Sequence, residues 1–228
     1  MRNALQQVRL DIITVKPYLT IKNILLFTIV PAFLIFTTQA LELPVMMVFM
    51  FCSLYVTYPF AVGDKNGIDT LYCTLPLTRR AVVTGRYLFA LCTNLVATLL
   101  ALALAGAGRL ILGASIQPMV FWGLLGGMWV WFTLSNSFTL PFYFKIGYTQ
   151  AKFLTYIPYF IFPIVTIVTS RLLQSLLTQQ ELESLLVTTA AWLSQNVLLL
   201  LLAGAAIVVS LYFLSYKLSV RFYQKRSF

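Results

Sequence analysis

The polar residues with the greatest potential for chemistry gather in one segment, residues 62–86, between two long apolar runs. A chain that only crossed a bilayer could join those runs by a tight turn, so this segment indicates a further role. Asn and Gly tolerate left-handed backbone angles, and the pair found here predicts a turn. We interpret the segment as a docking surface for a soluble partner. Its candidate residues are two carboxylates, the turn pair and two adjacent arginines: Asp64, Asp69, Asn66, Gly67, Arg79 and Arg80.

Lipid phosphates are the competing partner for the arginines of this segment. Cations at the cytoplasmic end of a span lie at headgroup depth, where phosphates attract them. Pairing with phosphate is the expected role of Arg86, which lies where the next apolar run begins. For Arg79 and Arg80, lipid anchoring and partner docking are equally consistent with the sequence.

Catalysis by this polypeptide alone is not expected. Its 228 residues include no histidine, which excludes His-based metal sites and a Ser-His triad. Cys52, Cys73 and Cys92 are scattered and match neither a zinc pattern nor a disulfide framework. The sequence also lacks the GxxxxGK phosphate loop that ends in Ser or Thr, so any ATP must bind another polypeptide. We expect no metal site and no cofactor in this chain.

Membrane-spanning helices are the elements that must position the polar segment. The chain is 60% hydrophobic and 10% charged, with a mean hydropathy of +0.88, so its polar groups could not cover a water-soluble protein. Continuous apolar runs of about 20 residues predict helices, because the strands of a barrel would alternate. We expect an all-α integral membrane protein, a single domain over residues 1–228. Its six predicted spans are residues 24–40, 44–61, 87–106, 120–140, 153–173 and 197–216.

Lysine and arginine predict the orientation of these spans. If the N-terminus is cytoplasmic, all 16 Lys and Arg residues except Arg109 and Arg171 fall on the inner side. Six spans then return the C-terminus to the cytoplasm. The net charge of +10 does not indicate nucleic-acid binding, because the cations form no stripe with interleaved aromatic residues. We expect a multi-pass protein of the cell membrane with both termini inside.

Two segments outside the spans have amphipathic patterns. In residues 1–22, Leu5, Val8, Ile12 and Val15 recur at helical spacing, which predicts an interfacial helix on the cytoplasmic surface that ends near Pro17. A poorly ordered leader is the alternative. Residues 174–196 mix leucines with Gln and Glu, which is typical of a short amphipathic helix on the outer face. A solvated linker explains that short pattern equally well.

Neutral polar side chains are the polar groups that the predicted spans carry in their interiors. The absence of acidic residues there argues against a proton-coupled or sodium-coupled transporter and against a cation channel. Asn94, Asn136, Tyr156 and Tyr159 are candidates to line a pathway for an amphipathic cargo. Hydrogen bonding between helices is the alternative, and it is the preferred explanation at any single position.

Two motifs resemble those of the type-2 permeases of ATP-binding cassette (ABC) transporters. Residues 63–90, GDKNGIDTLYCTLPLTRRAVVTGRYLFA, resemble the family's cytoplasmic loop, in which an acidic residue and Asn-Gly precede Leu-Pro-x-x-Arg and a Val-x-x-Gly-Arg/Lys-Tyr entry to the third span. Residues 140–152, LPFYFKIGYTQAK, resemble the Leu-Pro-x-x-Phe-Lys-x-Gly segment after the family's fourth span. Together with six spans and an amphipathic N-terminal helix, the likeness extends over nearly the whole chain.

This resemblance implies an ATP-driven exporter of the bacterial cell membrane. Two permease subunits, as a homodimer or a heterodimer, would form the pathway, and separate ABC ATPase subunits that bind ATP and Mg would dock from the cytoplasm. The implied coupling residues lie in residues 62–86 and in a second cytoplasmic loop. They are Asp64, Asn66, Gly67, Asp69, Leu75, Pro76, Arg79 and Arg80 in the first loop and Lys145, Gly147 and Lys152 in the second.

The lack of buried charge favours a hydrophobic or amphipathic substrate, such as a peptide, a drug or a lipid. Peptide export is slightly preferred, and that preference rests on the family resemblance. Two other functions remain open from the sequence. One is a secondary transporter or channel that works without ATP, and the other is a non-transporting membrane sensor or assembly factor.

Overall fold

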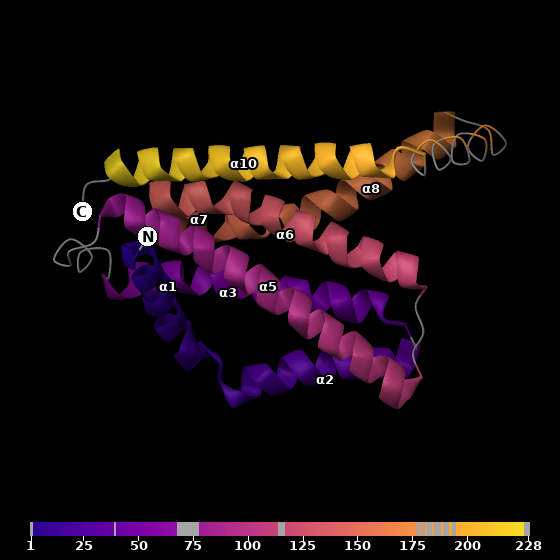
Figure 1. The fold of residues 1–228 in the computed structure, drawn as a ribbon, viewed down its shortest axis with the longest axis horizontal. Helices are drawn as coiled ribbons and strands as arrows, with labels where there is room; N and C mark the ends of the chain where they lie inside the picture. The colour runs from indigo at the N-terminus through magenta and orange to yellow at the C-terminus, as the bar shows by residue number, and fades with distance from the viewer. Residues whose placement is uncertain are drawn as a thin grey trace.

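Figure 1 presents the computed structural model of the chain, which describes residues 2–38, 40–67, 78–113, 117–176 and 195–225 and the single residues 178, 181, 184, 188 and 192. All elements within these ranges are helical, as the continuous apolar runs predict. In chain order they are α1 (Arg2–Val15), η1 (Lys16–Tyr18), α2 (Ile21–Thr38), α3 (Glu42–Asn66), α5 (Arg79–Leu112), α6 (Pro118–Ile146), α7 (Tyr148–Ala151), η2 (Lys152–Thr155), α8 (Ile157–Leu176) and α10 (Val197–Lys225).

The long helices form one bundle, and different parts of the chain meet at its two ends. α10 packs along α6, and α3 packs against α5. α1, the end of α3, the start of α5, the end of α6 and the end of α10 lie at one end of the bundle (Figure 1). The α2–α3 connection and the end of α5 lie at the opposite end. Both terminal helices therefore reach the same end of the bundle, which the predicted topology requires.

Five of the described helices are long and apolar enough to cross a membrane: α2, α3, α5, α6 and α10. They establish the chain as a multi-pass membrane protein. The fifth predicted span, residues 153–173, is divided in the structure. Phe153 belongs to η2, and α8 starts only at Ile157. Because α8 is not among the five helices, six spans and a cytoplasmic position of both termini stay predictions.

Several helices extend beyond the apolar runs from which they were predicted. α5 begins at Arg79, eight residues before the predicted span, and α10 continues through the basic end of the chain to Lys225. Apolar length measures the part of a helix that matches hydrocarbon, whereas the helix continues while its backbone remains hydrogen-bonded. The polar ends of α3, α5 and α10 are thus rigid helix rather than loop.

Local sequence signals account for the ends of several helices. α3 ends at Asn66, and Gly67 adopts a left-handed backbone with φ of 63°, as predicted for a glycine at a turn. Asp64, Lys65 and Asn66, predicted to share that turn, still belong to the helix. α5 starts with Thr78, whose hydroxyl accepts the N–H of Ala81 at 3.2 Å. Its other end is closed by Gly113, with φ of 66°. Much of the outer segment 174–196 lies outside the described residues.

Large buried side chains of α3 and α6 fill the centre of the bundle. Phe49, Phe132, Leu140, Tyr143 and Phe144 are each at most 2% exposed. They belong to one continuous apolar cluster that also includes residues of α5 and α10. Dense packing of this kind resists small displacements, which gives the bundle a rigid frame that holds the polar ends of its helices.

Candidate functional site

A hydrogen-bonded pair joins the two predicted cytoplasmic loops. Asp64 lies in the last turns of α3, and its Oδ2 accepts the backbone N–H of Thr149 at 2.9 Å and the Thr149 hydroxyl at 3.1 Å. Thr149 lies in the first turn of α7, where backbone N–H groups lack partners within the helix. A carboxylate satisfies these donors well. Asp64 therefore fixes the end of α3 to the loop that follows α6.

Gly147 makes the second loop turn sharply at the end of α6. Its φ of 80° and ψ of 170° are disfavoured for residues with a Cβ atom, and its N–H closes α6 by donating to Tyr143 O at 3.1 Å. Lys145 and Lys152, on either side, are exposed. The Lys145 ammonium lies 5.2 Å from the ring centroid of Phe222 in α10. The loop thus displays cations around a fixed turn.

Arg79 connects the start of α5 to the end of α10. Its Nη1 donates to the carbonyl oxygens of Tyr223 at 3.1 Å and Gln224 at 2.9 Å. The last carbonyls of a helix have no partner within it, so a guanidinium at this position satisfies them. Arg80 beside it is exposed. The remaining predicted coupling residues of this loop, Asp69, Leu75 and Pro76, lie outside the described residues.

Arg86 is not an exposed lipid anchor, contrary to the expectation from the sequence. It is 4% exposed, and its Nε lies 3.8 Å from Oδ1 of the buried Asp11 in α1. Nη2 donates to Pro59 O in α3 at 3.3 Å, and the guanidinium lies 4.0 Å from the Phe60 ring centroid. Packing of α1 over this part of α5 removes Arg86 from the headgroup region, where positive-inside reasoning placed it.

Burial governs the ionisation of Asp11. Removal from water raises the pKa of its carboxyl from an ordinary value near 3.8 to about 6, while the Arg86 charge and the hydrogen bond from Gln7 act in the opposite direction. The second carboxylate oxygen, Oδ2, has no hydrogen-bond partner among the described residues. The sequence carried one signal of this site, since Asp11 is the only acidic residue in the otherwise basic segment 1–22.

The α1 helix is confirmed, and the apolar residues that recur along it do not all face the bundle. Val8 and Val15 are buried, at 8% and 6% exposure. Leu5 and Ile12 are 63% and 53% exposed, which is the condition for contact with a membrane surface. The buried face also includes Gln7 and Asp11. Neighbouring helices of the same chain can satisfy buried polar groups by hydrogen bonds and opposite charges. The burial of residues in α1 therefore does not follow their hydrophobicity.

The two asparagines proposed to line a pathway lie inside the bundle. Asn94 of α5 is fully buried, and its amide donates to Trp129 O at 3.4 Å and Thr133 Oγ1 at 3.3 Å, both in α6. Asn136 is 5% exposed and donates to Phe132 O, one turn earlier in α6, at 2.8 Å. Asn94 thus serves to join two helices, and Asn136 bonds within its own helix.

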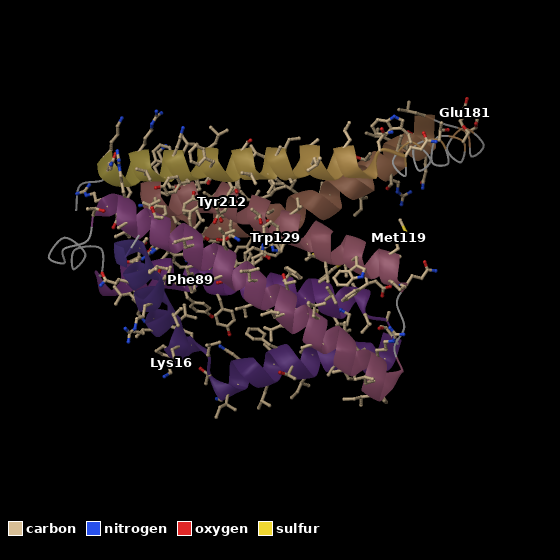
Figure 2. All side chains as sticks on the ribbon, viewed as in Figure 1. Lys16, Phe89, Met119, Trp129, Glu181 and Tyr212 are labelled. Carbon is tan, nitrogen blue, oxygen red and sulfur yellow. The ribbon has the colours of Figure 1, made fainter. Side chains whose placement is uncertain are left out.

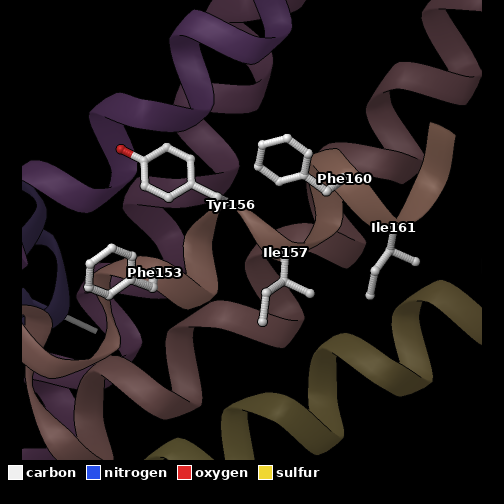
Figure 3. A pocket seen from close by; sticks show the side chains of 5 residues that line it. All are labelled: Phe153, Tyr156, Ile157, Phe160 and Ile161. Carbon is white, nitrogen blue, oxygen red and sulfur yellow. The ribbon is translucent and has the colours of Figure 1, made fainter. Parts of the chain in front are cut away.

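The two tyrosines of the same prediction have different surroundings. Tyr156 is 50% exposed and, with Phe153, Ile157, Phe160 and Ile161, lines an open apolar hollow on η2 and α8 (Figure 3). Tyr159 turns toward the bundle. Its hydroxyl bonds with that of Ser53 in α3, and its ring meets Trp131 of α6 edge-on at 4.8 Å between centroids. Tyr156 therefore belongs to an exposed apolar surface, and Tyr159 joins α8 to α3 and α6.

Residues 8–224 match the model of the family described as ABC-2 family transporter protein. The chain belongs to this family. The match begins at Val8 within α1 and ends at Gln224 near the end of α10, and it confirms the resemblance carried by residues 63–90 and 140–152. Permeases of the ABC-2 family are membrane components that work with an ATPase subunit and are generally not catalytic themselves. Searches of curated proteins and of solved structures found no match.

Proposed function

We propose that this ABC-2 chain is the permease subunit of an ATP-driven exporter, and that its two joined cytoplasmic loops receive the stroke of a separate ATPase. The observation that carries this proposal is the pair of hydrogen bonds from Thr149 to Asp64. A partner that pushes on either loop displaces both, because the carboxylate holds them together. The ends of α3 and α6 then respond as one surface.

The charge of this surface suits a partner with carboxylates. Arg80, Lys145 and Lys152 are exposed on α5, α6 and η2, at or beside the two loops. Exposed cations contribute little to stability, but they steer an oppositely charged partner and fix its orientation. We therefore propose that the ATPase presents acidic groups to Arg80 and to the Lys145–Lys152 loop. In the family, such an ATPase subunit is the normal companion of the permease.

A second permease subunit, identical or homologous, completes the proposed pathway. The described spans of one chain pack around a filled core, and Asn94 and Asn136 are buried within it. A pathway would therefore run between subunits, along surfaces such as that of Tyr156. That surface is apolar, which supports a hydrophobic or amphipathic substrate such as a peptide, a drug or a lipid. Transport would be outward, from the cytoplasmic side.

Co-purification tests this function directly. The tagged permease is isolated from native membranes in mild detergent, and the ATP hydrolysis of any associated ATPase is measured in nanodiscs. Asp64→Ala removes the acceptor of both Thr149 hydrogen bonds, and Asp64→Asn keeps one acceptor oxygen without the charge. Glu42→Gln, at the opposite end of α3, is the matched control because it changes the same kind of charge away from the loops.

We expect Asp64→Ala to reduce permease-stimulated ATP hydrolysis at least about fivefold, the lower range of usual coupling free energies. Asp64→Asn should lie between Asp64→Ala and the wild type, and Glu42→Gln should match the wild type. Isolation of the permease without an ATPase would refute the exporter. Unchanged stimulation in Asp64→Ala would refute the role of the joined loops, even for a genuine complex.

A further inference from the structure

α1 turns a polar stripe toward the rest of the protein. Gln7 and Asp11 lie one helical turn apart and are both fully buried, and the Gln7 amide donates to Asp11 Oδ1 at 3.0 Å. A helix that only rested on a membrane would turn its polar side chains toward water rather than bury them against other helices. α1 therefore carries a specific docking face for α5 and α3.

Arg86 is the residue that this docking face meets. It comes from α5, faces Asp11 of α1 across 3.8 Å, and donates to Pro59 O of α3 at 3.3 Å. Its flat side covers the Phe60 ring at 4.0 Å, where cation and aromatic face attract each other. One guanidinium, carried by α5, thus contacts two other helices, α1 and α3. α3 contacts it through Pro59 and Phe60, and α1 contacts it through Asp11.

A buried pair of this kind favours one arrangement of helices more than it favours folding itself. Replacement of both charges by apolar side chains is often neutral for stability, whereas removal of one partner leaves an uncompensated buried charge. Sliding α1 along α5 would separate Asp11 from Arg86 and create the same unfavourable state. Hydrophobic contact is not directional and would tolerate such sliding. The pair therefore fixes the register of α1 against α5.

We propose that Asp11 and Arg86 are positioning residues that make α1, the end of α3 and the start of α5 move as one body during transport. This inference rests on the proposed function. Asp64 lies in α3 just beyond Pro59 and Phe60, both of which contact Arg86. Displacement of Asp64 by the ATPase is thereby carried through α3 to Arg86, and from Arg86 to Asp11 of α1.

Four variants of the permease test the pair in complex with its ATPase in nanodiscs. Asp11→Asn and Arg86→Gln each break it. Asp11→Leu with Arg86→Met replaces it with apolar side chains of similar size, and Asp11→Arg with Arg86→Asp exchanges the charges. Arg9→Gln, an exposed change on the same helix, is the matched control. Readouts are permease-stimulated ATP hydrolysis, the apparent melting temperature, and hydrogen exchange of residues 2–15 in the permease alone.

We expect each single variant to accelerate exchange in α1 and to lower stimulated hydrolysis at least about fivefold. The apolar pair should keep a near wild-type melting temperature and still lose stimulation, which a merely structural pair would not do. The variant with swapped charges should recover part of the stimulated ATP hydrolysis and part of the slow hydrogen exchange in α1. Arg9→Gln should change neither quantity. Wild-type coupling in the apolar pair, or unchanged α1 exchange in both single variants, would overturn the proposal.

The same measurements separate this inference from the proposed function. If no ATPase accompanies the wild-type permease, the exporter is refuted, and exchange in α1 still decides whether the pair holds that helix in register. If the ATPase binds and is stimulated normally by Asp11→Asn and Arg86→Gln, the exporter stands and the positioning role is refuted.

Discussion

Gln7 of α1 lies directly against the Cα atom of Gly85 in α5. A Cβ atom placed on Gly85 would lie 2.5 Å from the Gln7 Cβ, closer than real Cβ contacts allow, and 3.0 Å from the Ala4 carbonyl oxygen, which is unusually tight. The two helices thus cross at a point where only glycine fits. Side chains along both helices appear in Figure 2. The crossing places Asp11 within reach of Arg86, the neighbour of Gly85 in sequence.

Gly85→Ala should therefore displace α1. Overpacking of this kind typically costs about 1–3 kcal/mol, more than the roughly 1 kcal/mol by which alanine favours a helix interior over glycine. Faster hydrogen exchange in residues 2–15 would report the displacement. Gly106→Ala is the control in the same helix, because a Cβ there meets nothing within 4 Å. Slower exchange in Gly85→Ala than in the wild type would contradict the close crossing.

Asp11 should titrate near pH 6 in the folded protein, because burial raises its pKa from about 3.8 to about 6. The folded state then binds the proton more tightly than the unfolded state. Stability contributed by Asp11 is highest below about pH 4 and decreases as the pH rises to about 6, by about 3 kcal/mol. Infrared absorption of the protonated carboxyl, identified by its loss in Asp11→Asn, measures the midpoint.

Replacement of Arg86 should move the titration midpoint of Asp11 to higher pH. The positive charge of Arg86 lowers the pKa of Asp11, whereas burial raises it. Arg86→Met removes the charge, so burial raises the pKa further. Arg9→Met changes an exposed cation of α1 and should leave the midpoint in place. A midpoint near pH 4 in the wild type would show that Asp11 is solvated, and it would contradict the docked position of α1.

Tyr87→Phe should loosen α10 from α5. The Tyr87 hydroxyl bonds with Ser215 Oγ at 2.6 Å and Ser219 Oγ at 2.8 Å, and all three side chains are buried. Loss of the hydroxyl leaves buried serine groups with fewer partners, which typically costs about 1–3 kcal/mol. A lower melting temperature in detergent would report the loss. Tyr18→Phe, at an exposed tyrosine, should have little effect, and equal melting of both variants would refute the role of these bonds.

Arg79→Gln should fray the end of α10. The wild-type guanidinium satisfies the Tyr223 and Gln224 carbonyls, and the shorter neutral amide of Gln cannot bridge both. We expect faster hydrogen exchange in residues 221–225 and no change in the middle of α10. Arg80→Gln removes an exposed neighbour of the same charge and should leave that exchange unchanged. Fraying in both variants alike would indicate a general effect of charge rather than these two bonds.

The sequence by itself determined that this is a helical membrane protein of the ABC-2 family. Apolar runs long enough to match hydrocarbon, the Asn66-Gly67 turn and the helix of residues 2–15 are local properties, which neighbouring residues fix through backbone geometry and transfer from water. The family motifs also indicate the function, because they are recognised from short stretches of sequence. None of these inferences depends on which helices are neighbours in the folded protein.

Only the tertiary structure decided which faces meet. In a membrane, outward apolar side chains are as normal as inward ones, so periodicity shows that α1 has two faces without showing which face docks. Periodicity therefore does not identify Gln7 and Asp11 as buried residues, and the positive-inside rule alone places Arg86 among lipid phosphates. Asp64 and Thr149 are likewise far apart in sequence, and their bond arises from the packing of α3 against α6 and α7. Buried polar contacts depend on partners that the bundle alone brings together.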